Sequence, residues 1–198
     1  KIGEQLMLHL YARSTQQEVR DLKEQRTIRN SINLKDCIPK WCNIKSKEFT
    51  EFYNTVVNTV VTGQKGEFEK SIIFHGIKFD FGLGGSHGCI KSGVYKSDDN
   101  NVILDLDVSS LYPSVAKSLN LYPAHLGPEF MELYSQFIDA RIAEKHKPKN
   151  ERDNVLIEGY KLLLNGTYGK SNENTSFMYD PLYTFKTTIG GQIFICMW

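Results

Sequence analysis

At residues 107–114 the chain reads Asp-Val-Ser-Ser-Leu-Tyr-Pro-Ser. An apolar run at residues 102–106, Val-Ile-Leu-Asp-Leu, precedes it, and the alternation predicts a β-strand over residues 102–108. In that strand Asp105 and Asp107 share one face and lie roughly 7 Å apart, which is twice the rise per residue. The two serines and the proline that follow favour the start of a helix. A strand, a carboxylate, a tight turn and a helix start together suit a divalent cation beside a phosphate.

A second segment, at residues 161–169, reads Lys-Leu-Leu-Leu-Asn-Gly-Thr-Tyr-Gly. Lys161 and Asn165 are one helical turn apart, so they share one face of a predicted helix. The octapeptide resembles the first catalytic motif of family B DNA polymerases, Asp-x-x-Ser-Leu-Tyr-Pro-Ser. The second segment resembles their second motif, Lys-x-x-x-Asn-Ser-x-Tyr-Gly, with Gly166 in place of the more usual Ser. The resemblance covers residues 76–198 and is nearest to the viral or phage-like branch of the family.

The resemblance implies template-directed DNA synthesis, in which deoxynucleotides are added to a primer 3′-OH by two-metal nucleotidyl transfer and pyrophosphate is released. It implies two Mg²⁺ ions, for which Mn²⁺ could substitute, a DNA primer–template and deoxynucleoside triphosphates. Asp107 would bridge both metals, helped by the carbonyl of Val108, and Asp105 is its rival as the ligand. The family's third motif, Asp-Thr-Asp, does not occur in the chain. We therefore expect the second catalytic Asp beyond Trp198, and no polymerisation by these 198 residues alone.

The resemblance also assigns residues to the incoming nucleotide. Backbone N–H groups of Ser110, Leu111 and Tyr112 would meet the β- and γ-phosphates, and the Tyr112 ring would exclude the 2′-hydroxyl of a ribonucleotide. The side chains expected at the triphosphate are Arg141, Lys145, Lys161 and Asn165. The residues expected at the nascent base pair or the DNA are Tyr168, Gly169, Gly84 and Gly85.

The two glycines named last belong to a glycine-rich stretch at residues 82–88, where the backbone is free to approach another chain closely. The stretch resembles the Gly-Gly element that contacts template in viral members of the family. Gly82 stands where those members carry an aromatic residue, and Phe81 is expected to serve instead.

The expected fold is α+β: part of a polymerase palm, with an antiparallel sheet and helices, plus a helical fingers hairpin. The predicted domains are a mostly helical linking region at 1–66, a palm part at 67–127, a fingers hairpin at 128–169 and a return to the palm at 170–198.

Periodicity predicts further elements. Helices are expected over residues 14–30 and 46–62, a flexible boundary at 62–66, and a strand at 71–75 that turns at Gly76. In the helix of the second motif, the residues expected to be buried are Val155, Leu156, Gly159, Leu162 and Leu163.

Composition sets wider bounds. Lys and Arg number 24 against 23 Asp and Glu, so any basic surface for nucleic acid must be local. No apolar run approaches the ~20 residues of a membrane span, and no signal peptide is visible, so a cytoplasmic location is expected, in the host if the protein is viral. The chain begins with Lys and ends in an apolar run, which suggests an excerpt of a longer protein. Four cysteines form no zinc pattern and are expected as free thiols: Cys37, Cys42, Cys89 and Cys196.

Two other classes of protein fit parts of the pattern. One is a non-catalytic nucleic-acid-binding descendant of the polymerase fold, which the presence of Asp107, Tyr112, Lys161 and Asn165 disfavours. The other is a reverse transcriptase or related nucleotidyl transferase, which the Lys-x-x-x-Asn-x-x-Tyr-Gly helix disfavours.

Overall fold

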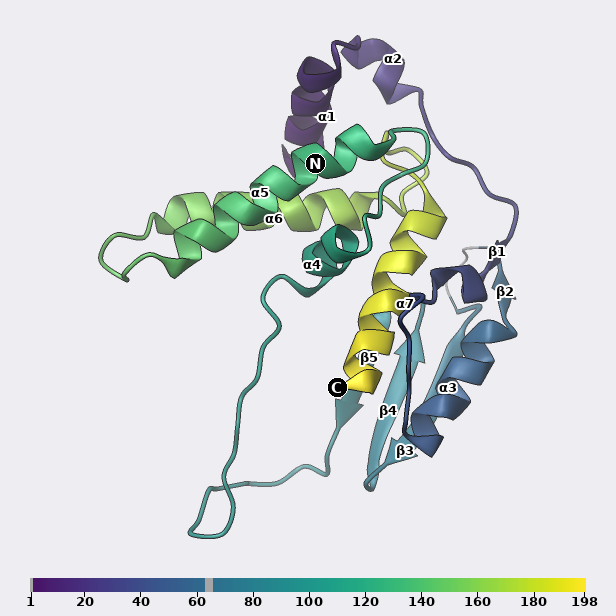
Figure 1. The fold of residues 1–198 in the computed structure, drawn as a ribbon, viewed down its shortest axis with the longest axis vertical. Coiled ribbons are helices and arrows are strands. Elements are labelled where there is room, and N and C mark those ends of the chain that lie inside the picture. The colour runs from purple at the N-terminus through teal and green to yellow at the C-terminus, as the bar shows by residue number, and fades with distance from the viewer. Residues whose placement is uncertain (1, 63–65) are drawn as a thin grey trace.

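The computed structural model describes residues 2–62 and 66–198, and its fold is α+β, with two groups of elements that meet at one long helix, α7 (Figure 1). The first group is helical and contains α1 (Ile2–Thr15), α2 (Val19–Lys23), α4 (Leu111–Ser118), α5 (Pro128–His146) and α6 (Asn154–Lys170). The second contains β1 (Ile32–Asn33), the 3₁₀ helix η1 (Leu34–Cys37), α3 (Lys47–Val57), β2 (Val60–Val61), β3 (Glu69–Phe74), β4 (Ile77–Gly82) and β5 (Gly85–Cys89).

Helix α7 (Pro181–Met197) belongs to both hydrophobic cores. Its Tyr183 packs in the helical core, whereas Ile189 and Ile193 pack in the core beneath the sheet. The helix begins where its sequence favours a start, because Asp180 caps the Leu182 N–H and proline occupies the first helical position. With apolar or small residues on nearly every side, α7 is buried along most of its length.

The antiparallel helical hairpin predicted for residues 128–169 is present as α5 and α6, which project from the body of the molecule (Figure 1). The Tyr134 hydroxyl donates to the Leu164 carbonyl at 3.0 Å and ties the two helices together. Helix α1 crosses α6 so closely that a Cβ on Gly3 would lie 2.9 Å from the Leu162 carbonyl oxygen.

The predicted buried face of α6 was wrong over most of its length. Val155 and Leu162 are 84% and 71% exposed, and the buried residues are Leu163, Leu164 and Thr167. The reason is that α1 covers only the C-terminal half of α6, near Gly3, and the N-terminal half extends toward the tip of the hairpin.

The three-stranded sheet is an antiparallel meander in the order β3-β4-β5. Strand β3 turns at Gly76, as predicted, where φ is +77° and glycine is favoured. Helix α3 covers one face of the sheet, with Phe52 stacked on Phe81 at a ring distance of 4.1 Å. A two-residue turn, Leu83–Gly84, joins β4 to β5, since Gly82 pairs with Gly85.

Two predicted helices are shorter in the structure. The helix expected over residues 46–62 ends at Val57, and Val60–Val61 pairs with β1 instead, in keeping with the strand preference of β-branched residues. Of the helix expected over residues 14–30, only Val19–Lys23 forms separately, because the chain beyond it bonds to distant loops. The boundary predicted at residues 62–66 falls largely outside the described residues.

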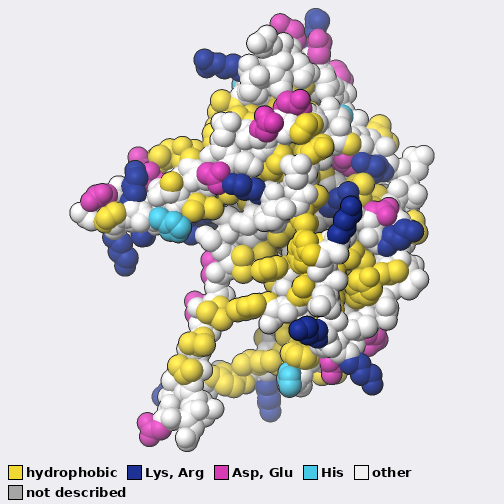
Figure 2. All heavy atoms as spheres, in the orientation of Figure 1, with side chains coloured by type: hydrophobic (Ala, Val, Ile, Leu, Met, Phe, Trp, Pro, Cys, Tyr) yellow, Lys and Arg dark blue, Asp and Glu magenta, His cyan; other side chains and the backbone are white. Residues whose placement is uncertain are grey.

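The strand predicted over residues 102–108 is not formed. The segment is extended (Figure 1) and lies on the surface (Figure 2). Val102 and Leu104 are 72% and 69% exposed. A strand requires a neighbour to accept and donate its backbone hydrogen bonds, and within residues 2–62 and 66–198 no strand pairs with this one. An apolar groove of about 540 Å³ lies between α4 and the end of α7, with Val108 and Phe194 among its walls.

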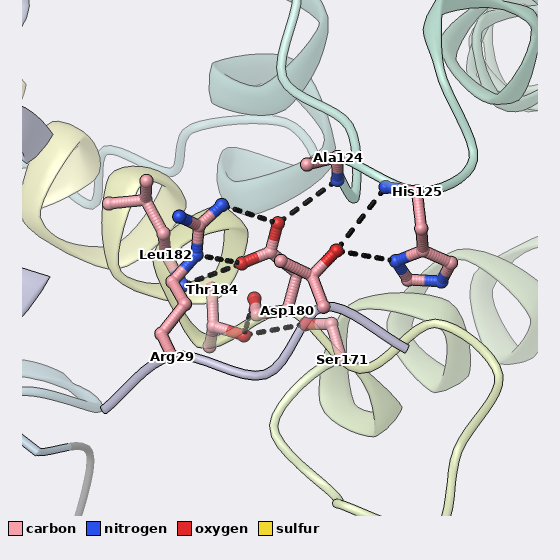
Figure 3. Close-up of polar contacts among 8 residues, drawn as sticks. Arg29, Ala124, His125, Ser171, Asp180, Leu182 and Thr184 are labelled. Atoms are coloured by element: carbon pink, nitrogen blue, oxygen red, sulfur yellow. Dashed lines mark hydrogen bonds and ion pairs between the residues drawn. The ribbon is translucent and has the colours of Figure 1, made fainter. Parts of the chain in front are cut away.

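A buried polar network joins three distant segments (Figure 3). The Asp180 carboxylate accepts from Arg29 Nε at 2.8 Å and Nη2 at 3.1 Å, and from the Ala124 N–H at 3.0 Å. Beside it, Thr27 Oγ1 lies 2.7 Å from His125 Nδ1. The connection after α2, the loop before α5 and the start of α7 are thereby held together.

Candidate functional site

Helix α4 begins with a strained residue. Ser110 occupies the N-cap position with φ 53° and ψ 51°, in the left-handed region, and its side chain makes no capping hydrogen bond. Such a conformation costs a non-glycine residue about 1–3 kcal/mol and is common at functional sites. The serines were predicted to favour a helix start, and the helix does start here, but the Ser110 hydroxyl accepts a hydrogen bond from α5 and does not cap α4.

The hydrogen-bond partner of the Ser110 hydroxyl is Arg141 of α5, whose Nη1 donates to Ser110 Oγ. Arg141 is only 9% exposed, and its buried Nε has no hydrogen-bond partner. One turn later, Lys145 Nζ donates to Ser109 Oγ at 3.4 Å. In the part of the chain that the structure describes, neither cation forms an ion pair with a carboxylate.

The start of α4 therefore suits an anion. Its first N–H groups, at Leu111 and Tyr112, have no partner within the helix, as at every helix N-terminus. Two cations from α5 converge on the same turn. A buried guanidinium without a counter-charge is unfavourable, so a bound anion that accepts hydrogen bonds from it would be strongly favoured.

Tyr112 sits against three neighbouring elements. Its ring lies 4.7 Å from that of Tyr168 in α6, at an interplanar angle of 34°. Its hydroxyl donates to the Gly84 carbonyl in the β4–β5 turn at 3.2 Å. On α7, Gly191 lies behind the ring, and a Cβ there would make an ordinary van der Waals contact, 3.5 Å from Tyr112 Cε1. Burial raises the pKa of both tyrosines, so both phenols are neutral hydrogen-bond donors at neutral pH.

The second-motif residues lie on one stripe of α6 that leads to this tyrosine pair. Lys161, Asn165 and Tyr168 share that stripe, and the contact of Tyr168 with Tyr112 turns it toward α4. Lys161 and Asn165 are exposed, and Lys161 Nζ pairs with Glu158 at 3.2 Å. Gly169 lines a cavity of about 490 Å³ together with Tyr168 and Gly84.

Asp107 is exposed in the extended segment, three residues before the strained serine. Because the strand is not formed, the shared face predicted for Asp105 and Asp107 has no support in the structure. Among the residues described, no group of three or more His, Cys, Asp or Glu side chains could hold a metal ion. Asp107 and the Val108 carbonyl thus offer at most part of a metal site, and these residues alone do not fit a two-metal centre.

Two residues of this site lie outside those that the two motifs specify. Ser109, which accepts from Lys145, lies at a variable position of the octapeptide pattern. Gly191 belongs to a Gly-Gly pair inside α7, and α4 approaches this pair closely, since a Cβ on Gly190 would lie 3.2 Å from Leu119 Cδ1.

The chain matches no protein-family model, no curated protein and no solved structure. In the described parts of the chain, no helix combines the length and the apolar character needed to cross a membrane.

Proposed function

We propose that this chain carries the nucleotide-binding centre of a template-directed DNA polymerase of the family B kind. The observation that carries the proposal is Arg141, a buried guanidinium at the Ser109–Ser110 turn without a carboxylate partner among the described residues. A triphosphate supplies the missing negative charge, and its oxygens can also accept from the free N–H groups at the start of α4.

In the proposed reaction the primer 3′-hydroxyl gives up its proton to water, and its oxygen attacks the α-phosphorus of a deoxynucleoside triphosphate. The bond from that phosphorus to the bridging oxygen breaks, and pyrophosphate leaves with the electron pair. Arg141 and Lys145 would neutralise the leaving group, with Lys161 and Asn165 along α6 toward the α-phosphate. Asp107 would give one carboxylate to Mg²⁺, for which Mn²⁺ could substitute; in such reactions two metals stabilise the attacking and leaving oxygens.

The remaining elements have places in this proposal. The α5–α6 hairpin would be the fingers, and α4, α7 and the meander would be part of the palm. Tyr168 and Gly169, with Gly84 and Gly85, would face the base pair and the DNA primer–template. The Tyr112 ring would lie under the sugar and exclude ribonucleotides.

Equilibrium binding of a labelled deoxynucleoside triphosphate to the protein at its natural length tests the centre. Loss of a hydrogen bond to a charged group is worth about 1.5–3 kcal/mol, so Arg141→Met should weaken binding by about tenfold to hundredfold. Lys23→Met, a change on the exposed face of α2, is the matched removal of a positive charge. Equal binding by both variants would refute the assignment.

Primer extension by the same protein, with Asp107→Asn as its control, tests the chemistry. Extension that Asp107→Asn abolishes supports the polymerase. Nucleotide binding that depends on Arg141 without any extension would instead favour the non-catalytic descendant.

A further inference from the structure

The β4–β5 turn touches the one tyrosine on which sugar selection depends in the proposed function. Gly85 has φ +150°, a conformation that side chains rarely adopt. An ideal Cβ on Gly85 would lie 2.7 Å from Tyr112 Oη, which is closer than real Cβ contacts allow. The preceding residue, Gly84, accepts the hydrogen bond from that same hydroxyl.

The turn itself is held firmly against α7. Gln192, which is 2% exposed, donates from Nε2 to the Gly82 carbonyl at 2.9 Å. Gly82 is paired with Gly85 across the hairpin, so the hydrogen bond from Gln192 also fixes how far Gly85 and the turn lie from α7. The neighbouring residue on α7, Gly191, forms the wall behind the Tyr112 ring.

The position of the Tyr112 side chain is thus limited by neighbours on several sides. Tyr168 limits the ring on one side and Gly191 on another, and the turn limits the hydroxyl end. A polar cavity of about 700 Å³ opens at this end, and Gly84, Gly85 and Tyr112 are among its lining residues. A side chain at position 85 would occupy the space that the hydroxyl now fills.

We propose that Gly85 is a positioning residue for Tyr112: by leaving room for the phenol hydroxyl at the Gly84 carbonyl, it sets where the ring stands and therefore which sugar the site accepts. The proposal rests on the proposed function for its consequence, the choice between deoxyribose and ribose. Its structural premise, contact between position 85 and the Tyr112 hydroxyl, is independent of any activity.

A double-mutant cycle in the protein at its natural length tests the premise. Gly85→Ala is made in the wild type and in a Tyr112→Phe background, which lacks the atom that the new methyl would strike. Urea unfolding should show the folding equilibrium constant falling about tenfold more in the wild type than in the Tyr112→Phe background. Backbone strain alone would lower both equally, and that result would overturn the proposal.

Gly76→Ala is the matched control for strain. Gly76 also has positive φ, in the other turn of the same meander, but a Cβ there meets nothing within 4 Å. Its effect on unfolding should therefore be the same with and without the Tyr112 hydroxyl.

The consequence is measured as the ratio of kcat/KM for a deoxynucleotide to that for the matching ribonucleotide. A small misplacement of a positioning group has large kinetic effects, so Gly85→Ala should lower this ratio by about tenfold, and Gly76→Ala should leave it unchanged. An unchanged ratio in Gly85→Ala would overturn the role in selection. If the wild type adds no nucleotide at all, the proposed function fails, while the unfolding cycle still decides whether Gly85 positions Tyr112.

Discussion

Replacing Asp180 with alanine would remove, in one step, the acceptor that joins three segments of the chain. Its carboxylate is 2% exposed and is paired with Arg29, whose side chain is 27% exposed. It also accepts from the N–H groups of Ala124 and Leu182 (Figure 3). In the alanine variant all of these donors stay where they are and lose their partner.

The size of the effect follows from those donors. Loss of the α7 cap at Leu182 costs about 1 kcal/mol, and an unsatisfied Ala124 N–H adds about 1–3 kcal/mol. The Arg29 side chain keeps some access to water, so the loss of its partner should add a destabilisation toward the low end of the same range. Together these agree with the ~3–5 kcal/mol expected when one member of a buried ion pair is removed. Asp180→Asn, which retains an acceptor for the cap, should cost less than Asp180→Ala.

Urea unfolding followed by circular dichroism measures the loss. Asp21→Ala is the control, because Asp21 is paired with Arg20 on the surface at 64% and 92% side-chain exposure, and such pairs contribute about 0–1 kcal/mol. A loss for Asp180→Ala no greater than that of the control would refute the conclusion that this network holds the segments together.

Three further predictions concern stability. Burial lowers the pKa of His125. As pH drops through about 6.5 the unfolded chain therefore takes up a proton before the folded one, and the free energy of unfolding should fall. His125→Gln should flatten that fall between about pH 7.5 and 5.5, and an unchanged slope would contradict the assignment of the pH dependence to His125. Gly3→Ala should lower the urea midpoint of unfolding, because the new Cβ would meet the Leu162 carbonyl where α1 crosses α6. Gly159→Ala lies in open space on α6 and should stabilise the protein by about 1 kcal/mol through helix propensity. A loss of stability in both variants would show that the contact between α1 and α6 does not cause the effect of Gly3→Ala. Arg141→Met should raise the free energy of unfolding by about 1 kcal/mol or more, since it removes a buried charge that has no carboxylate partner among the described residues; a destabilised variant would mean that the hydrogen bond to Ser110 outweighs the cost of burying the charge.

The sequence pattern correctly predicted the elements that depend mainly on interactions between residues near one another in the chain. Helix α5 begins at Pro128, where the predicted hairpin of residues 128–169 begins, and proline suits the first helical position. The β3–β4 turn follows from Gly76 in a conformation that glycine favours. The hairpin of α5 and α6 also follows, because a short polar break separates two helical segments. The α+β fold class is borne out at that level.

The remaining differences arise from contacts between residues distant in sequence. Residues 102–108 alternate as a strand does, but alternation cannot provide the partner strand that would pair with them. The periodicity of α6 predicted an apolar face without showing that α1 covers only half of it, near Gly3. The octapeptide predicted an anion at the start of α4, but it could not show that Arg141 would be buried there with no carboxylate partner in the described part of the chain.

The exposed apolar segment at residues 102–106 has a consequence for how this protein should behave at high concentration. Residues 102–106 combine high strand propensity with exposed apolar side chains and pair with no strand in the described parts of the chain, which are the features that lead separate molecules to add strands to one another. Asp105 and Asp107 place exposed carboxylates in and beside the same segment, and repulsion between copies should oppose such pairing. Because dissolved salt screens that repulsion beyond about 10 Å at 0.1 M, raising the ionic strength should favour self-association of the protein.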